Sequence, residues 1–397
     1  MKLILTKIGK AFCAIKRDGV YRGGKRVLRA FFSTLRFVGS GDVLIITGGV
    51  GDSARYRAWH YAEELNLNGI KTAVAYQDNP FLARYSAKFK VFIFHRTLYT
   101  GKVKKLIEKI KEQNKEIIFE TDDLVYDPEF LKYMDYYKNM NFLEKKLYEN
   151  GVGGEILDDD YVKVCTTTTT FLAKKLKEKG KQVFLVPNKL CKQDIEWTEE
   201  ILKGKKKENK DEIIIGYFSG TISHNKDFAT IEKPLEEIMK KHPQTKLFLA
   251  GPLDINHNLV KKFGDRIINT PYVPRKEHFK NIAKVDINIS PLEKDNPFCE
   301  SKSELKFFEA GALKIPTVAT ATQTFSEAIK DGIDGFVAKD SKEWTNKLEK
   351  IIINKELREK IGEKAYEKTL RDYTTENSQN KEYYAYLKKQ IQQQSNG

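Results

Sequence analysis

The feature that most constrains the fold is an alternation of short apolar runs with amphipathic helical segments, which occurs twice along the 397 residues. The apolar runs fall at 42–47, 72–77, 91–95, 116–120, 162–167 and 182–187, and then at 213–218, 246–251, 266–273, 285–291, 317–319 and 335–339. Such alternation is typical of parallel strands joined by crossover helices. The sequence therefore predicts an α/β protein built from two Rossmann-like parallel-sheet domains.

A polar, charged stretch over residues 192–212 separates the two series and has the composition of a domain boundary. We predict a first domain over 41–192, completed by a C-terminal helix at 376–397, and a second domain over 211–375. Apolar residues make up 40% of the chain, which is enough to give each domain its own core.

Residues 1–40 differ from both domains in composition. The stretch from Met1 to Phe37 holds ten Lys/Arg residues and one acid, Asp18, and its apolar residues recur at helical spacing. A basic amphipathic pair of helices is typical of segments that lie on an anionic membrane surface. The alternative is that both helices pack on the first domain and keep their basic side chains in water.

The chain carries a formal net charge of +15, from 70 Lys+Arg and 55 Asp+Glu. This excess favours an anionic partner such as a nucleotide diphosphate, a phospholipid surface or a nucleic acid. The sequence contains no nucleic-acid-binding motif, so we expect no nucleic-acid partner. The four cysteines lack metal-ligand spacing and are expected to be free thiols in a reducing cytoplasm. No apolar run approaches the roughly 20 residues of a membrane span.

The first domain has a glycine-rich turn, residues 48–53, between its first strand and its first helix. Backbone amides at Gly49 and Gly51 are suited to a diphosphate or to an acceptor group. Arg55 and Arg57 follow in the helix. We expect these arginines near the edge of the sheet where a ligand would bind, and the alternative is that they lie on the solvated side of the helix.

His95 ends one predicted strand, and Asp122 and Asp123 follow the next one. Ligands of open α/β sheets gather at the carboxyl ends of the strands. We therefore expect all three residues to act in catalysis, with the acids binding hydroxyl groups or moving protons. The alternatives are a structural histidine and acids that only cap the strand end. A metal is not favoured, because no further carboxylates occur at ligand spacing.

The first strand of the second domain leads into a polar turn and a helix. The candidate phosphate-binding residues here are Ser219, Gly220, Thr221, His224 and Lys226. Small residues after a strand leave room for a phosphate, and basic side chains neutralise it. An ordinary turn followed by solvated basic residues is the alternative.

The stretch 301–320 is predicted to form a short helix, a turn and a buried strand. Lys302, Lys306 and Glu309 fall at i, i+4 and i+7 and share one face of the helix. The N-terminus of this helix would suit a phosphate, and Glu309 could then hold a ribose diol. The alternative is a buried helix with a solvated charged face.

Residues 308–318, Phe-Glu-Ala-Gly-Ala-Leu-Lys-Ile-Pro-Thr-Val, resemble the signature of retaining glycosyltransferases of family 4, within the glycosyl transferases group 1. Proteins of that family have the GT-B fold, in which two Rossmann-like domains face each other across a cleft. The resemblance implies that Glu309 binds the nucleotide ribose and that His95 contacts the donor sugar. Ser301 stands where the family has the first glutamate of a Glu-x7-Glu pair, and Glu300 is one residue out of register.

The resemblance also implies that Arg55 and Arg57 lie on the acceptor side, and it implies further contacts with the donor. Lys226 and Lys302 would neutralise the diphosphate, with Lys302 acting in catalysis, and the base would stack near Tyr272 and Val273. The expected donor-binding set is completed by Ser301, Ser303 and Lys306.

The resembled family implies a glycosyltransferase, of the hexosyl- or deoxyhexosyl-transferase kind, that moves a sugar with retention. The donor would be a nucleotide-diphosphate sugar and the acceptor a glycan or a lipid-linked molecule, in cell-surface polysaccharide or glycolipid biosynthesis. The protein would be cytoplasmic and attached through residues 1–40 to the inner face of the cell membrane. No cofactor or metal is expected, because protein cations would stabilise the leaving diphosphate. The alternative is a catalytically silent GT-B protein that binds a nucleotide or serves as a scaffold for a partner.

Overall fold

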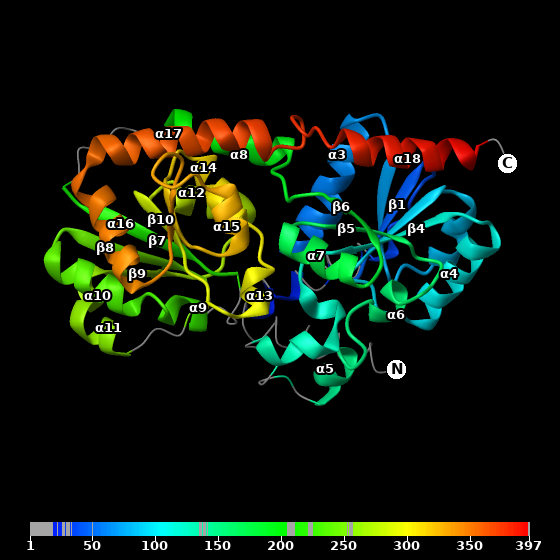
Figure 1. The fold of residues 1–397 in the computed structure, drawn as a ribbon, viewed down its shortest axis with the longest axis horizontal. Helices are drawn as coiled ribbons and strands as arrows, with labels where there is room; N and C mark the ends of the chain where they lie inside the picture. The colour runs from blue at the N-terminus through cyan, green and yellow to red at the C-terminus, as the bar shows by residue number, and fades with distance from the viewer. Residues whose placement is uncertain are drawn as a thin grey trace. The chain divides into compact units, whose positions relative to one another are not determined.

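The computed structural model describes residues 19–21, 23–25, 28, 32, 34–49, 51–134, 137, 140, 142–204, 211–220, 225–251, 253 and 257–395. The chain divides into two compact units. Unit 1 comprises Met1–Lys132, Tyr137–Lys189 and Gln379–Gly397, and unit 2 comprises Tyr133–Tyr136 and Leu190–Ser378. Each unit has its own sheet covered by helices (Figure 1). Most of the predicted N-terminal helix pair lies outside the described residues, so that feature remains a prediction.

The sheet of unit 1 has six parallel strands in the order β2-β1-β3-β4-β5-β6. They are β1 (Val43–Thr47), β2 (Thr72–Tyr76), β3 (Val91–His95), β4 (Glu116–Thr121), β5 (Val164–Thr167) and β6 (Gln182–Leu185). Strands β1 and β3 are buried along their whole length, as expected for apolar strands with helices on both faces. The order reverses between β1 and β3, which makes this pair the topological switch point of the sheet.

The helices of unit 1 are short, apart from α4, α7 and the C-terminal helix α18. In chain order they are α2 (Asp52–Ala54), η1 (Arg55–His60), α3 (Tyr61–Leu67), η2 (Leu82–Ala87), α4 (Gly101–Glu112), η3 (Leu124–Tyr126), η4 (Pro128–Tyr133), α5 (Phe142–Leu147), α6 (Gly154–Leu157), α7 (Thr170–Glu178) and α18 (Lys381–Gln393). The predicted first helix is a continuous run of α2, η1 and α3, and its middle six residues form a π-helical segment. Such segments are frequent at functional sites.

Helix α18 belongs to unit 1 because its apolar stripe is buried in the core of that unit. Tyr383, Tyr384 and Leu387 pack there with residues of β1, β3 and α3. The Tyr384 hydroxyl also donates a hydrogen bond to Glu64 Oε1 at 2.5 Å, and Lys189 Nζ lies 2.9 Å from Glu64 Oε2. The C-terminal helix is thereby anchored to unit 1 by both apolar and polar contacts.

The sheet of unit 2 has six parallel strands in the order β12-β11-β10-β7-β8-β9. They are β7 (Ile213–Phe218), β8 (Thr245–Ala250), β9 (Ile267–Thr270), β10 (Ile287–Ser290), β11 (Thr317–Thr320) and β12 (Phe336–Ala338). This is the strand order of the Rossmann fold, and it reverses between β7 and β10. The predicted α/β class with two Rossmann-like sheets is therefore confirmed.

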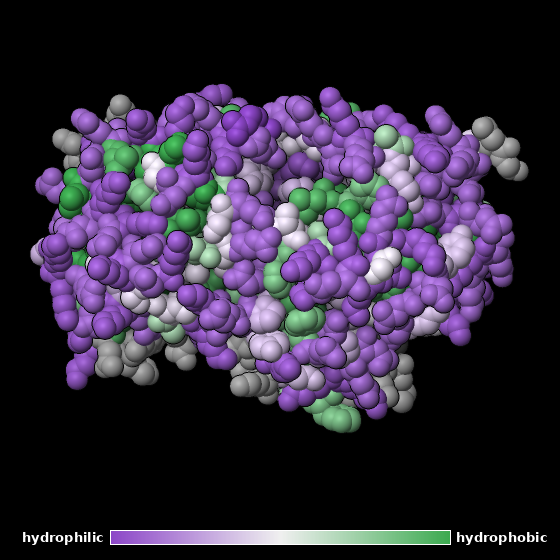
Figure 2. All heavy atoms as spheres, viewed as in Figure 1, coloured by the Kyte–Doolittle hydropathy of each residue, from purple (hydrophilic) through white to green (hydrophobic). Residues whose placement is uncertain are grey.

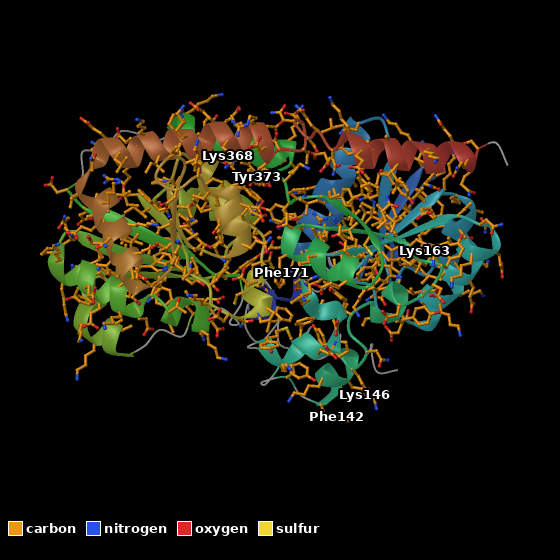
Figure 3. The ribbon with its side chains drawn as sticks, in the orientation of Figure 1. Phe142, Lys146, Lys163, Phe171, Lys368 and Tyr373 are labelled. Atoms are coloured by element: carbon orange, nitrogen blue, oxygen red, sulfur yellow. The ribbon has the colours of Figure 1, made fainter. Side chains whose placement is uncertain are left out.

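Helices cover the sheet of unit 2 on both faces. They are α8 (Lys192–Gly204), α9 (Asn225–Ala229), α10 (Glu232–Lys241), α11 (His257–Phe263), η7 (Gly264–Arg266), α12 (Arg275–Ile282), α13 (Pro297–Glu300), α14 (Leu305–Gly311), α15 (Gln323–Ala328), α16 (Ser341–Ile353) and α17 (Lys355–Asp372). Apolar residues of α10 and α16 pack against β7 in one core. Helix α17 ends beside α14, where Tyr373 stacks on Phe308 with ring centroids 4.8 Å apart (Figure 3 labels Tyr373 and Lys368).

The stretch expected to be a polar boundary contains a helix of unit 2. Helix α8 occupies 192–204 of the predicted 192–212 segment. Its buried residues include Asp194 and Thr198, and Asp194 forms an ion pair with Arg275 of α12. Because α8 is held by polar contacts, a reading of hydropathy does not distinguish it from a polar linker. This explains why a domain boundary was predicted where the structure has a helix.

The face of the molecule drawn in Figure 2 is predominantly polar. Figure 2 shows one face on which hydrophilic residues prevail and hydrophobic residues form separate patches over both units. Within the part of the chain that the structure describes, no helix is both long enough and apolar enough to cross a membrane.

Candidate functional site

The switch point of unit 1 depends on a glycine that directly follows β1. The Gly48 amide donates a hydrogen bond to the His95 carbonyl at 3.0 Å. A Cβ atom at this position would lie 1.9 Å from the Arg96 carbonyl oxygen, so only glycine fits without a shift of the backbone. The predicted Gly49 and Gly51 have no atom within 4 Å of such a Cβ, and both are exposed. Close packing therefore requires Gly48, which the sequence analysis did not select.

His95 is buried at the end of β3, with 1% of its surface exposed. Its Nδ1 lies 3.0 Å from Thr47 Oγ1, and its Nε2 lies 3.1 Å from Ser53 Oγ. Ser53 also donates to Asp122 Oδ2 at 2.9 Å. The structure thus brings the predicted His95 and Asp122 together, with Ser53 between them.

Arg96 joins the two predicted acids of unit 1. Its Nε donates to Asp122 Oδ1 at 2.5 Å, and its terminal nitrogen donates to Asp123 Oδ2. Burial by itself would raise the pKa of Asp122, but the charge of Arg96 and hydrogen bonding from His95 hold that pKa well below its usual range. Arg96 has φ +45°, a conformation that is uncommon for a residue with a side chain and that occurs at functional sites.

Asp123 has a structural function in addition to its pairing with Arg96. Its Oδ1 accepts a hydrogen bond from the Val125 amide at 3.0 Å and caps the 3-10 helix η3. Sequence reasoning missed Ser53 and Arg96. Ser53 lies in the turn that follows β1, and Arg96 directly follows His95 at the end of β3. These positions at strand ends were the signal in the sequence that could have identified them.

The two predicted acceptor-side arginines have different environments. Arg55 is partly exposed and lies 3.5 Å from Asp52. Arg57 is 1% exposed, and its guanidinium donates to both oxygens of Glu120, to the Val186 carbonyl and to Asn188. The expectation for Arg57 is therefore wrong, because all of these partners lie inside unit 1 and leave no surface for an acceptor. A buried guanidinium requires such partners to offset its desolvation.

The switch point of unit 2 also has a close backbone contact. The Ser219 amide donates to the Ala250 carbonyl at 2.8 Å. Gly251 has φ +97°, and a Cβ on it would lie 1.9 Å from the Ser219 carbonyl oxygen. Gly220 and Lys226 are exposed near this turn, on the loop and on α9. Thr221 and His224 lie outside the described residues, so their predicted roles remain predictions.

The segment predicted as a helix from residue 301 contains two short helices. Helix α13 ends at Glu300, and α14 starts at Leu305 and has seven residues. Ser301 is fully buried, and its Oγ donates to the Phe298 carbonyl at 2.8 Å. The helix therefore begins four residues later than predicted, with the buried Glu304 as its N-cap residue, and the phosphate site expected at its N-terminus remains a prediction.

Burial is the largest cause of the lowered pKa of Lys306. The negative charge of Asp227 acts against this decrease, and the positive charge of the neighbouring Lys302 adds to it. Among the described residues, neither lysine has a carboxylate at ion-pair distance. The ammonium of Lys302 lies 6.0 Å from the centre of the Phe298 ring, and that of Lys306 lies 5.8 Å from the centre of the Tyr217 ring. Two neighbouring ammonium groups that lack an ion-pair partner can stabilise a bound anion.

Glu309 is buried on α14 and has two cationic or polar neighbours from α12. Arg275 donates to Glu309 Oε1, and His278 Nε2 lies 3.3 Å from Glu309 Oε2. The same guanidinium holds Asp194 of α8, with 2.9 Å between Arg275 Nη2 and Asp194 Oδ2. Sequence analysis missed Arg275 and His278, because their partners are far away along the chain.

The remaining predicted residues of unit 2 lie at its surface. Tyr272 is 46% exposed, and Val273 and Ser303 are half-buried. An exposed aromatic ring is available for stacking on a base. The structure does not otherwise test their expected contacts.

One cluster in unit 2 has ligand types that occur at metal sites. Asp227, Glu293 and Cys299 have ligand atoms within 4.8 Å of one another. Asp227 Oδ1, however, accepts hydrogen bonds from the Cys299 thiol at 3.3 Å and from the Glu293 amide at 3.0 Å. Burial and the charge of Asp227 raise the pKa of the Cys299 thiol, which disfavours the thiolate that a metal would need. This donor set fits a hydrogen-bonded cluster better than a metal centre.

Comparison with known proteins gives one family match and several structural relatives. Residues 198–368 match the family model described as "Glycosyl transferases group 1". A glycosyltransferase from Rickettsia africae has a TM-score of 0.59 and 15% identity, and the alignment covers 89% of this chain and 100% of that protein. Sucrose-phosphate synthase from Thermosynechococcus elongatus has a TM-score of 0.58 and 13% identity, and the alignment covers 89% of this chain and 99% of that protein.

A third structural relative, Anabaena Alr3699/HepE, has been solved in complex with UDP and glucose. It has a TM-score of 0.55 and 13% identity, with 90% of this chain and 99% of that protein covered. At such identities the likeness shows the fold alone, and no curated protein sequence matches this chain significantly. The predicted GT-B fold and the resemblance to glycosyl transferases group 1 are thereby confirmed.

Proposed function

From the match of residues 198–368 to glycosyl transferases group 1, we propose that this protein transfers a sugar from a nucleotide-diphosphate donor to a glycan or lipid-linked acceptor. That match is the observation that carries the proposal. The GT-B fold supports it, because both sheets have a switch point of the kind where ligands bind in open α/β folds.

Unit 2 is proposed to bind the donor. Lys302 and Lys306 supply positive charge that no described carboxylate neutralises at ion-pair distance, and a diphosphate would provide the missing anion. Glu309 would accept hydrogen bonds from the ribose hydroxyls. Its contacts with Arg275 and His278 would hold the carboxylate in place. The relative solved with UDP and glucose makes UDP-glucose the first donor to test.

The transfer step needs a stabilised leaving diphosphate and an acceptor hydroxyl close to the anomeric carbon. The two lysines would provide the first by electrostatic stabilisation. We propose retention of configuration, on the resemblance to family 4, with the leaving phosphate accepting the proton of the acceptor hydroxyl. Neither a metal nor a cofactor is part of this proposal.

Unit 1 is proposed to bind the acceptor at its own switch point. Asp122, Ser53 and Arg96 are partly exposed there, and Asp122 and Ser53 can bind the hydroxyl groups of a sugar. For the pathway we propose cell-surface polysaccharide or glycolipid assembly. Residues 1–40 would attach the protein to the inner face of the cell membrane, and a variant without them should not sediment with anionic vesicles.

A silent GT-B protein is the second candidate, and one observation favours it. Ser301 occupies the position of the first family glutamate, and its hydroxyl is buried and bonded to Phe298. It therefore cannot replace a carboxylate at the donor. The silent protein would bind a nucleotide without transferring sugar.

A thermal-shift screen with nucleotide diphosphates and nucleotide sugars tests the donor site. A ligand at 100 times its Kd adds about 2.7 kcal/mol to the stability of the native state, so one nucleotide should raise the Tm clearly. Glu309→Ala should abolish the shift, whereas Glu277→Ala, a change at an exposed residue of α12, should retain it. Absence of a shift with every nucleotide would contradict the proposal. A shift without turnover of any donor would favour the silent protein.

A further inference from the structure

Three side chains in unit 1 form a continuous chain of hydrogen bonds that the family match does not cover. Ser53 Oγ lies 3.1 Å from His95 Nε2 and 2.9 Å from Asp122 Oδ2. On the other side of the imidazole ring, Thr47 Oγ1 lies 3.0 Å from Nδ1. Nε2 also lies 3.5 Å from Asp122 Oδ1. Both ring nitrogens are therefore engaged inside the unit, and the His95 side chain is almost fully buried.

The position of each proton follows from counting donors. Asp122 also accepts from the Arg96 guanidinium at 2.5 Å, which keeps the carboxylate ionised and leaves it only acceptors. The single proton of the Ser53 hydroxyl must then point to Asp122. For a hydrogen bond to exist between Ser53 Oγ and His95 Nε2, the nitrogen must be the donor.

The contact on the opposite side of the ring does not restrict the imidazole in this way. The Thr47 hydroxyl can donate to a bare Nδ1 or accept from a protonated Nδ1, since its proton can rotate. Protonation of the ring therefore changes only the Nδ1 side. The bond from Nε2–H to Ser53 and on to Asp122 stays the same in both charge states.

We propose that Ser53 is a positioning residue that, with Asp122, holds the proton of His95 on Nε2. On the proposed function, a sugar at this edge of the sheet meets the Ser53 hydroxyl and the Asp122 carboxylate, not the buried imidazole. These groups offer acceptors, so they select a ligand through its own hydroxyl donors. Hydrogen bonds in such a chain also polarise and strengthen one another.

The experiment is a long-range ¹H–¹⁵N correlation spectrum of the full-length protein with ¹⁵N-labelled histidine. The chain has six histidines, and the His95 signals are identified by their loss in His95→Gln. The spectrum is recorded at a pH at which the ring is neutral, as established by titration of the same signals. We expect Nε2 to have the shift of a protonated nitrogen and Nδ1 that of a bare nitrogen.

Three variants test the cause of this preference. In Asp122→Asn the amide can donate to Ser53, which frees the Ser53 proton for Nε2, so the ring proton should move to Nδ1. Ser53→Ala should reduce the share of the Nε2–H form without abolishing it, because Asp122 Oδ1 still lies 3.5 Å from Nε2. Ser53→Thr, which keeps the hydroxyl, should preserve the wild-type spectrum, and Thr47→Ser should do so as a control on the other nitrogen.

An Nδ1–H ring in the wild type would overturn the proposal, as would an unchanged Nε2–H form in both Asp122→Asn and Ser53→Ala. The spectrum is recorded without substrate, so it tests the position of the His95 proton separately from the proposed sugar transfer. A protein with the Nε2–H form that transfers no sugar contradicts the proposed function and leaves the proton assignment intact. If Asp122→Asn does not fold, Ser53→Ala and Ser53→Thr still decide the question.

Discussion

Units 1 and 2 balance the charges of their candidate site residues differently. In unit 1, Arg96 is neutralised by Asp122 and Asp123. In unit 2, Lys302 and Lys306 have no carboxylate at ion-pair distance among the described residues. The first arrangement is complete without a ligand and is suited to positioning hydroxyl groups. The second has positive charge left to bind an anion, which agrees with a donor diphosphate in unit 2.

The carboxylates near each site also differ in their surroundings. Glu120 of unit 1 is fully buried with Arg57 and accepts from Thr166 as well, so its function is structural. Glu309 of unit 2 shares its arginine, Arg275, with Asp194 and also faces His278. Arg275 is 10% exposed, so this cluster lies closer to the surface. The comparison suggests that unit 2 can exchange an internal contact for a ligand and that unit 1 cannot.

Removal of the buried arginine of unit 1 should have the largest effect. Arg57→Ala leaves Glu120 buried without its main partner, and breaking such a pair costs about 3–5 kcal/mol. Urea unfolding measures this loss. The matched control is Arg55→Ala, which removes an exposed contact with Asp52 worth at most about 1 kcal/mol. Equal effects of the two variants would contradict the assignment of Arg57 as structural.

The glycines at the two switch points should come next. Gly48→Ala forces a Cβ against the Arg96 carbonyl, and overpacking of this kind costs about 1–3 kcal/mol. Gly251→Ala should cost at least as much, because it adds an unfavourable backbone conformation to the same clash. Gly49→Ala is the control, with an expected change within about 0.5 kcal/mol. A large loss of stability in Gly49→Ala would mean that contacts other than the one between Gly48 and the Arg96 carbonyl restrict this turn.

The positive charge of Lys302 and Lys306, which have no ion-pair partner among the described residues, predicts a change in ligand affinity. Lys306→Ala should weaken binding of a nucleoside diphosphate about tenfold, which corresponds to about 1.4 kcal/mol. Isothermal titration calorimetry at two salt concentrations measures both the loss and its electrostatic origin. Lys364→Ala removes an exposed lysine that pairs with Glu367 and should leave the affinity unchanged. Equal affinities for wild type and Lys306→Ala would remove Lys306 from the donor site.

The smallest effect is expected at Glu304, whose pKa is raised by burial. A carboxyl with a raised folded-state pKa stabilises the protein below its unfolded pKa of about 4.3 and loses this contribution as pH rises through the folded value. Glu304→Gln should therefore be more stable than wild type at pH 8 and equal to it near pH 4. Urea unfolding at both pH values measures the difference.

Asp122 of unit 1 should give the opposite pH dependence of stability. Its pKa is lowered in the folded state, so its contribution is present at neutral pH and is lost as pH falls below about 4. Asp122→Asn should thus be less stable than wild type at pH 8. The difference in the free energy of unfolding should become smaller as the pH is lowered. The same sign of pH dependence for Glu304→Gln and Asp122→Asn would contradict the proposed difference between the two environments.

Much of the fold could be predicted from the sequence, because buried parallel strands are continuous apolar runs with polar residues at their ends. The predictions for 91–95 and 213–218 coincide with β3 and β7. Helix α8 was missed, since the residues that bury it include Asp194 and Thr198. The start of α14 was predicted four residues too early, because the helical spacing of Lys302 and Lys306 does not reveal that Ser301 is bonded to Phe298.

The candidate site was predicted less completely than the fold. The sequence identified His95 and Asp122 from their places at strand ends, and the structure brings them together. It misassigned Arg57, because a helical arginine has the same local pattern whether it is exposed or paired with Glu120. It missed Arg275, whose partner Glu309 is 34 residues away along the chain.

The sequence by itself determined the two parallel sheets, the position of the switch-point turns and the family that the second unit resembles. All of these depend on local patterns: the period of apolar residues, glycine after a strand, and a short signature around Glu309. Only the tertiary structure decided which charges are neutralised. Ion pairs such as Arg57 with Glu120 and Arg275 with Asp194 join segments 63 and 81 residues apart, and their energy depends on distance and burial that no local pattern contains.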